Sequence, residues 1–314
     1  MGDSEVDFDK MYAEERKDLK YDFKEKKPEI QKQFKDFWSR PYAKEDVDAY
    51  YNKLGLIEKK DAGAHSNSVI EKEDADAHSE GRREGPANSV PYHYNKGGNL
   101  EGNWVKSSTA FTGYADDPKN VDNIFVSNKD VLIVGNFASF DIAQYPGNSS
   151  PAGMSAVHLL GLTRERIYNG VSLPKEKIHL LNDIKELFAE SWSGQEFRGK
   201  VIRHQLNRIK ERYDRTGNEE GHELAKKHYK ELEEEIHRLK VENFKFGLHL
   251  FPDHSVGHFH MHIVAMTPEM RQWSTSKHDM KTKDVDEVRE AIQTFDRNTK
   301  TFRRVQGSND YGVI

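Results

Sequence analysis

One stretch near the end of the chain, HFHMHIVAM at residues 258–266, alternates between imidazole and apolar side chains. Successive side chains of a β-strand point to opposite faces, so the three histidines of this stretch would share one face. The apolar residues between them would share the other face and pack on a core. The alternation therefore predicts a strand with one imidazole face and one apolar face. The three histidines are His258, His260 and His262.

Three interpretations of the imidazole face are open from the residues alone. The histidines could be polar side chains on a solvated strand face. They could hold a metal, because two histidines at positions i and i+2 of a strand can reach one zinc ion, although no carboxylate motif nearby completes such a set. They could also attack phosphorus, because a neutral imidazole is a nucleophile at physiological pH and its neighbours can donate hydrogen bonds to phosphoryl oxygens. Three imidazoles within five residues favour chemistry over a solvated face.

Periodicity predicts the elements around this strand. A hairpin is expected where two apolar runs flank Ser-Asn-Lys-Asp, and further strands and helices are expected where apolar residues recur with strand or helix spacing. The ranges are 121–137 for the hairpin, 155–163 and 244–251 for strands, and 173–192 and 285–295 for helices. Strands and helices that follow no regular βαβ rhythm predict an α+β fold, with an antiparallel sheet and flanking helices.

The remaining segments are strongly charged, and charged residues make up 32% of the chain. Residues 1–60 are expected to form a charged helical N-terminal extension, and residues 61–103 a linker or irregular loop. Residues 104–314 would then be the catalytic domain. A charged helical insertion at 196–240 is expected to be either a solvated helical hairpin or an element for dimerisation or substrate capping.

An aromatic stripe punctuates the N-terminal extension, at Phe34, Phe37 and Trp38. Spacings of three and four residues place these rings on one side of a helix, which could dock on the body of the protein or on a partner subunit. A homodimer is the expected assembly.

Composition excludes several classes of function. The chain has no cysteine, which excludes disulfides, thiolate metal sites and a cysteine nucleophile. Its net charge of -5 gives no global attraction to double-stranded nucleic acid or to an anionic membrane. No run approaches the ~18 apolar residues of a membrane span, and the N-terminus lacks a signal-peptide core. We expect a cytoplasmic protein, with a nuclear location also open.

HFHMHIV, residues 258–264, resembles the H-φ-H-φ-H-φ-φ signature of the histidine triad (HIT) superfamily of nucleotide hydrolases and transferases. VHLLGLTRERI, residues 157–167, is similar to the strand-and-turn motif of that family and places His158 on its leading histidine. FDIAQYP resembles the loop whose acidic residue holds the ribose hydroxyls, which places Asp141 there. Among subfamilies, FGLHLFPDHSVGHFHMH looks most like the C-terminal catalytic domain of scavenger mRNA-decapping enzymes.

The resemblance implies a HIT-like fold and a nucleotide hydrolase or nucleotidyl transferase that acts on a phosphoanhydride or phosphoramidate bond. It implies that His260 is the nucleophile, that a hydrogen bond to the backbone carbonyl of His258 orients it, and that a covalent nucleotidyl-histidine forms. His262 and His158 would line the phosphate and leaving-group side. Ser255, in the turn before the triad, and His249, in the similar Leu-His dipeptide of the preceding strand, are expected to bind substrate. No metal and no cofactor is implied.

A cationic stretch follows the triad, in MRQWSTSKHDMKTKD. It is expected to be either a solvated surface loop or a lid whose cations meet a polyphosphate or acidic substrate. The cationic residues are Arg271, Lys277, His278 and Lys281. The substrate partner is expected to be a nucleotide or a nucleotide-like phosphorylated small molecule. Two other functions stay open: a HIT fold recruited for other chemistry on a specialised metabolite, with or without a metal, and a nucleotide-sensing binding protein.

Overall fold

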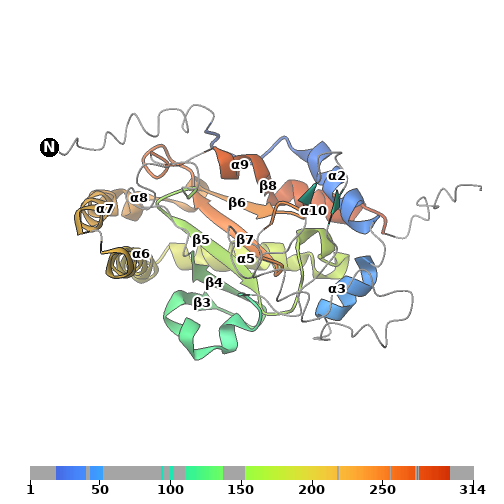
Figure 1. The fold of residues 1–314 in the computed structure, drawn as a ribbon, viewed down its shortest axis with the longest axis horizontal. Coiled ribbons are helices and arrows are strands. Elements are labelled where there is room, and N and C mark those ends of the chain that lie inside the picture. The colour runs from blue at the N-terminus through green and yellow to red at the C-terminus, as the bar shows by residue number, and fades with distance from the viewer. Residues whose placement is uncertain are drawn as a thin grey trace, which may run out of the picture.

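The protein is described by a computed structural model that covers residues 19–39, 43–51, 93–94, 100–101, 110–136, 153–217, 219–254, 256–272, 274 and 276–297. These residues form an α+β structure around an open antiparallel sheet of six strands (Figure 1). The strand order is β3-β4-β5-β7-β6-β8. The expected α+β class and antiparallel sheet are therefore confirmed.

The six strands are β3 (Ile124–Ser127), β4 (Val131–Gly135), β5 (His158–Thr163), β6 (Phe244–His249), β7 (His260–Ala265) and β8 (Thr282–Asp284). The strands β1 (His93–Tyr94) and β2 (Leu100–Glu101) form a separate antiparallel pair. The expected hairpin is present as β3 and β4. Its turn is built around Asn128, whose side-chain oxygen accepts hydrogen bonds from the backbone N–H groups of Asp130 and Val131, both at 2.9 Å.

The α-helices are α2 (Lys27–Trp38), α3 (Ala43–Tyr51), α5 (His179–Trp192), α6 (Gln195–Thr216), α7 (Glu219–Glu231), α8 (Glu233–Arg238), α9 (Lys277–Lys281) and α10 (Val285–Thr294). Short 3-10 helices span Tyr114–Asp116, Pro118–Asn123, Gly170–Ser172, Lys175–Lys177 and Val241–Asn243. Figure 1 shows α6, α7 and α8 at one end of the molecule and α2, α3 and α10 at the other. Among the described residues, no helix is both long and apolar enough to cross a membrane.

The helix α5 packs on one face of the sheet at very short range. It buries residues spaced three and four apart, among them Leu181, Ile184 and Phe188, as its periodicity predicted. A Cβ atom at Gly161 of β5 would lie only 2.3 Å from Cγ2 of Ile184. The close approach of α5 to the sheet therefore requires glycine at this position.

The two faces of β7 differ as the alternation predicted. Met261 and Ile263 belong to the main hydrophobic core, which also contains the buried side of α5. His262 lies on the opposite face, where Leu160 of β5 is its direct cross-strand neighbour. The face that carries the imidazoles is therefore separate from the face that carries most of the core.

The N-terminal helices are part of the main core and not a separate extension. Ile30, Phe34 and Phe37 of α2 are completely buried there. The ring of Phe37 packs against that of Phe251, with ring centroids 5.1 Å apart. Because the chain itself covers Phe34 and Phe37, the aromatic stripe docks on the body of the protein, which is one of the two expected alternatives. Most of the linker predicted at 61–103 lies outside the described residues.

The charged insertion predicted at 196–240 forms α6, α7 and α8. The break between its first two helices falls at Gly217, which has a left-handed backbone conformation with φ of 66°. Exposed ion pairs cover the outer side of these helices, such as Lys210 with Asp214. The inner side buries Ile209, Tyr229 and Ile236 in the main core. The insertion therefore extends the core and is not a hairpin that stands free in solvent.

Candidate functional site

A row of buried polar side chains crosses the sheet on the face opposite α5. The register of the strands explains the row: His158 and His249 lie diagonally across from His262, at a separation that long side chains can bridge. Gly247 is the direct neighbour of His262 on β6, so no side chain there separates the rings of His262 and His249. In order across the sheet, the row consists of Asn136, His158, His262, His249 and Thr282.

Each member of this row contacts the next. The amide Nδ2 of Asn136 lies 3.0 Å from Nδ1 of His158, and Nε2 of His158 lies 2.9 Å from Nδ1 of His262. The rings of His262 and His249 then stack at a tilt, with centroids 4.1 Å apart. Nε2 of His249 lies 2.9 Å from the hydroxyl of Thr282. The row is thus a continuous set of contacts from the end of β4 to β8.

His260 lies beside this row and has a fixed orientation. Its Nδ1–H donates a hydrogen bond of 2.8 Å to the backbone carbonyl of His258, which confirms the orienting bond that was predicted. In the neutral ring, Nε2 then carries a lone pair and no hydrogen. Within the described part of the chain, this Nε2 makes no hydrogen bond. The centroid of the His260 ring lies 5.1 Å from that of His262. The ring of Phe111 makes an edge contact with the ring of His260, with centroids 5.2 Å apart.

His258 differs from its expected place on the imidazole face. It precedes the first residue of β7 and is completely buried. Its Nε2 donates to the backbone carbonyl of Thr163 at 2.9 Å, and its Nδ1 accepts from the hydroxyl of Tyr50 at 2.8 Å. Both ring nitrogens are engaged inside the protein, so His258 contributes its carbonyl to the site and no free ring nitrogen.

Burial keeps the imidazoles neutral. For each of these histidines, desolvation is the largest cause of the shift in pKa. It lowers the pKa of His158 to about 3 and that of His258 to about 4. It also lowers the pKa of His260, and it lowers the pKa values of His249 and His262 well below 6.5. The row and its neighbours therefore present neutral rings near neutral pH, which is the form that can attack an electrophile or share a single hydrogen with a neighbour.

Two of the predicted lid residues lie near these rings. The ring of His278 on α9 is nearly parallel to that of His249, with centroids 6.2 Å apart. After burial, the positive charge of Lys281 contributes to lowering the pKa values of His249 and His260. Contact of His278 and Lys281 with a substrate remains a prediction. Asp141, Ser255 and the side chain of Lys277 lie outside the described residues.

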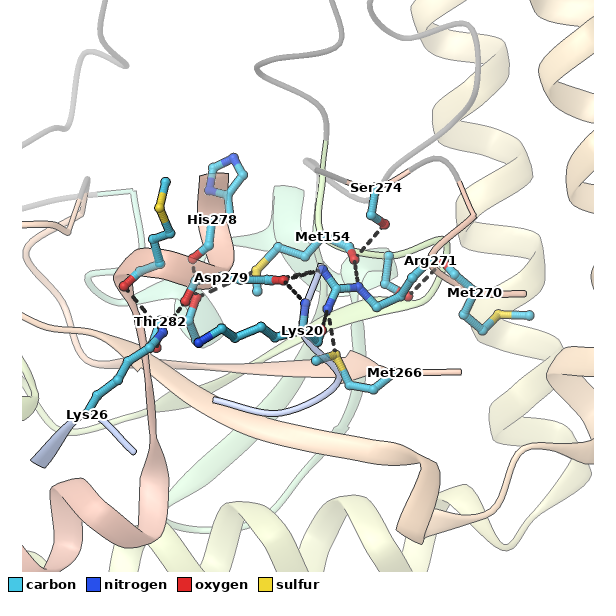
Figure 2. Close-up of polar contacts among 12 residues, drawn as sticks. Lys20, Lys26, Met154, Met266, Met270, Arg271, Ser274, His278, Asp279 and Thr282 are labelled. Carbon is cyan, nitrogen blue, oxygen red and sulfur yellow. Dashed lines mark hydrogen bonds and ion pairs between the residues drawn. The ribbon is translucent and has the colours of Figure 1, made fainter. Parts of the chain in front are cut away.

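Arg271 does not have the role that was predicted for it. Its side chain is completely buried, and its guanidinium forms two hydrogen bonds to the carboxylate of Asp279, at 2.7 and 2.9 Å (Figure 2). It also donates to the backbone carbonyls of Met154, at 3.1 Å, and Lys20. The expectation that Arg271 binds substrate is therefore wrong, because its hydrogens are used within the fold.

The N-terminal segment fastens α9 to the body of the protein. The ammonium group of Lys26 donates to the backbone carbonyls of Asp279, Met280 and Thr282 at the end of this helix, as Figure 2 shows. A cation is favourable there because the last carbonyls of a helix carry partial negative charge. The backbone N–H of Lys20 donates to the carboxylate of Asp279 at 3.3 Å. Residues 20–26 therefore hold the helix that carries His278 and Lys281.

Three side chains that contact the histidines are not among the predicted site residues. They are Asn136, Tyr50 and Thr282. Asn136 directly follows a predicted strand, and Tyr50 belongs to an aromatic helix, but neither position has a pattern that names a histidine as its partner. In the described part of the chain, no three His, Asp or Glu side chains are grouped so as to hold a metal ion.

Comparisons with known proteins do not assign the site to a family. No protein-family model matches the chain, and no curated protein matches it significantly.

Proposed function

We propose that the protein is a HIT-type hydrolase or nucleotidyl transferase that acts on a phosphoanhydride or phosphoramidate bond of a nucleotide. The observation that supports this proposal best is the hydrogen bond from Nδ1 of His260 to the carbonyl of His258. It leaves the Nε2 lone pair of a neutral, oriented imidazole available for attack. The HIT-like fold itself is part of the same proposal.

The proposed reaction has two displacements at phosphorus. In the first, Nε2 of His260 forms a bond to phosphorus while the bond from phosphorus to the leaving group breaks, and the leaving group takes a proton from a neighbouring donor or from water. In the second, water or another hydroxyl acceptor attacks the same phosphorus and loses a proton to the neighbouring group or to solvent, while the P–N bond breaks and the neutral imidazole is restored. The carbonyl of His258 stabilises the positive ring that exists between the two steps.

The surroundings of His260 suit the charge that develops on phosphoryl oxygens. After the larger effect of burial, the positive charge of Lys281 contributes to lowering the pKa values of His260 and His262. Charge on the equatorial oxygens of a transferring phosphoryl group is stabilised by such cations and by fixed hydrogen-bond donors. Lys281 and the ring of His262 are therefore the groups that we assign to the phosphoryl oxygens.

The test is a panel of nucleoside phosphoramidates, dinucleoside polyphosphates and cap analogues, assayed with the wild type and with His260→Ala. The matched control is His179→Ala, since His179 is a largely exposed histidine on α5. We expect turnover by the wild type and by the control, no turnover by His260→Ala, and a nucleotidyl mass adduct on the peptide that contains His260 after quenching without acid. Turnover by His260→Ala, or an adduct on another residue, would contradict the proposal. Tight binding of a nucleotide without any turnover would indicate a nucleotide-sensing protein instead.

A further inference from the structure

One nitrogen of His262 is buried and has no hydrogen-bond partner among the residues that the structure describes. The residue is 7% exposed, its Nδ1 is bonded to His158, and its Nε2 makes no hydrogen bond within the part of the chain that the structure describes. Buried polar atoms are nearly always paired, and an unpaired one destabilises the protein. The ring lies 5.1 Å from that of His260, so a group bound at His260 is close to this nitrogen. A ligand atom that pairs with Nε2 would complete the site.

Asn136 lies two positions from His262 along the row. It determines whether Nε2 of His262 donates or accepts a hydrogen bond. The amide Nδ2 of Asn136 is a donor, so Nδ1 of His158 must accept its hydrogen bond. A neutral His158 then carries its hydrogen on Nε2 and donates it to Nδ1 of His262. A neutral His262 must in turn carry its own hydrogen on Nε2. The unpaired nitrogen is therefore a donor.

The opposite side of the row does not compete with this arrangement. The hydroxyl of Thr282 donates to the backbone carbonyl of His278 at 2.7 Å, so it can accept a hydrogen from Nε2 of His249. The rings of His249 and His262 meet at a tilt of 39°, and no nitrogen-to-nitrogen hydrogen bond between them is present in the described part of the chain. Among the described residues, the position of the hydrogen on His262 is therefore set from the Asn136 side of the row and not from the Thr282 side.

We propose that Asn136 is a positioning residue that sets the tautomer of His262 through His158, so that His262 offers an Nε2–H donor to an oxyanion of the substrate. The inference builds on the proposed function, because it takes the ligand to be a phosphoryl oxygen at His260. A fixed donor is better suited to this task than a freely rotating hydroxyl, because its hydrogen already points in one direction before the ligand arrives.

The decisive variant is Asn136→Asp, which keeps the shape of the side chain but leaves only acceptors. His158 must then carry its hydrogen on Nδ1, its Nε2 becomes an acceptor, and His262 carries its hydrogen on Nδ1. The lone pair on Nε2 of His262 would repel an oxyanion. The control is Asn123→Asp, which introduces the same charge at a neighbouring buried asparagine whose Nδ2 donates to the carbonyl of Gly135 and to the Tyr114 hydroxyl and not to a ring of the row.

The measurement is long-range ¹H–¹⁵N NMR of protein labelled at histidine, recorded at alkaline pH so that every imidazole of the row is neutral, with signals assigned through His262→Gln. We expect the Nε2–H tautomer of His262 in the wild type and in Asn123→Asp, and the Nδ1–H tautomer in Asn136→Asp. Titration with inorganic phosphate should show binding roughly ten- to a hundredfold weaker in Asn136→Asp, the range for one hydrogen bond to a charged group.

An Nδ1–H tautomer of His262 in the wild type would overturn the inference. The wild-type measurement tests the inference even if Asn136→Asp does not fold. An unchanged His262 tautomer in a folded Asn136→Asp protein would overturn it as well, as would a changed tautomer with unchanged phosphate binding. The tautomer is read without any turnover. Absence of a nucleotidyl adduct on His260 would therefore count against the proposed function and leave the tautomer result standing.

Discussion

His258 and His260 are two residues apart and use their ring nitrogens in opposite ways. His258 engages both nitrogens with the protein, through Thr163 and Tyr50, and offers its backbone carbonyl to the site. His260 donates one N–H to that carbonyl, which orients its ring, and leaves its other ring nitrogen available. Within the same triad, one imidazole is therefore a structural support and the next is the candidate nucleophile.

The pH dependence of turnover follows from the lowered pKa of His260. In the proposed reaction only the neutral ring attacks, and burial lowers the pKa of His260 below the ordinary value of 6.5. We therefore expect kcat to decrease toward acidic pH with a midpoint below pH 6.5, as the folded protein takes up the proton. The measurement is kcat against pH with a substrate from the panel. A midpoint above pH 6.5 would show that His260 is not the group that must be neutral.

The hydroxyl of Tyr50 provides a test of how the N-terminal helix supports the triad. Tyr50→Phe leaves Nδ1 of the buried His258 without its donor, which should lower the free energy of unfolding by about 1–3 kcal/mol. Tyr51→Phe is the control, because Tyr51 is 44% exposed and bonds Glu165 at the surface. Its expected effect is close to zero. Urea unfolding measures both, and equal stability of the two variants would mean that the bond to His258 contributes nothing.

At this scale, the sequence predicted the residues that share a strand but not those that meet from distant segments. The alternation in residues 258–264 was enough to place His260 and His262 on one face, and the resemblance supplied the orienting carbonyl of His258. Tyr50 lies 208 residues from its histidine partner, and a hydrogen bond over that separation leaves no local pattern in a single sequence. Arg271 was misplaced for a related reason, because its charge alone does not show that Asp279 neutralises it inside the fold.

At the scale of elements, α9 depends on its neighbours for its structure. A helix of five residues is too short to be stable alone, so the buried pair of Arg271 and Asp279 and the ammonium group of Lys26 must hold it. The charges of this segment predict either a surface loop or a lid. They do not indicate that one side of α9 is buried. The longer helices were easier to predict, because α5 and α10 have amphipathic spacing over many residues.

Removing the buried partner of Arg271 tests this dependence. Asp279→Asn leaves an uncompensated buried guanidinium and should lower the free energy of unfolding by about 3–5 kcal/mol. Glu290→Gln breaks the exposed ion pair with Lys27 and is the control, with an expected effect close to zero. Urea unfolding gives the energies, and amide hydrogen exchange shows whether residues 277–282 lose protection first. If the two variants lost the same stability, the buried pair would not be what holds α9.

At the scale of the whole molecule, one core joins segments from both ends of the described chain. Ile30, Phe34 and Phe37 pack with residues of β7 and α10 in the same cluster. The high charge of residues 1–60 predicts a helical extension, but that average conceals a few aromatic positions at helical spacing. Composition over a long window cannot identify such positions, whereas the stripe at Phe34, Phe37 and Trp38 could.

Truncation separates these two interpretations. A fragment that begins at Gly102 lacks Phe34, Phe37 and Tyr50. Replacing one buried phenylalanine with alanine typically lowers the free energy of unfolding by about 3–5 kcal/mol. Their sum approaches the whole stability of an ordinary domain, so we expect this fragment not to fold. A fragment that begins at Leu19 retains them and should fold. Circular dichroism and the cooperativity of urea unfolding are the measurements, and cooperative unfolding of the shorter fragment would contradict this expectation.

The bond between Tyr50 and His258 also has a consequence for synthesis on the ribosome. Helices α2 and α3 leave the exit tunnel early, but 208 residues must be added before the partner of Tyr50 is made. At the usual rate of translation this takes roughly 10–40 s, during which the residues of β7 and α10 that complete the cover of α2 have not yet been made. The nascent chain therefore presents an incompletely covered aromatic helix for much of its synthesis, which is the kind of segment that chaperones bind. The candidate site can be assembled only after β7 has been released.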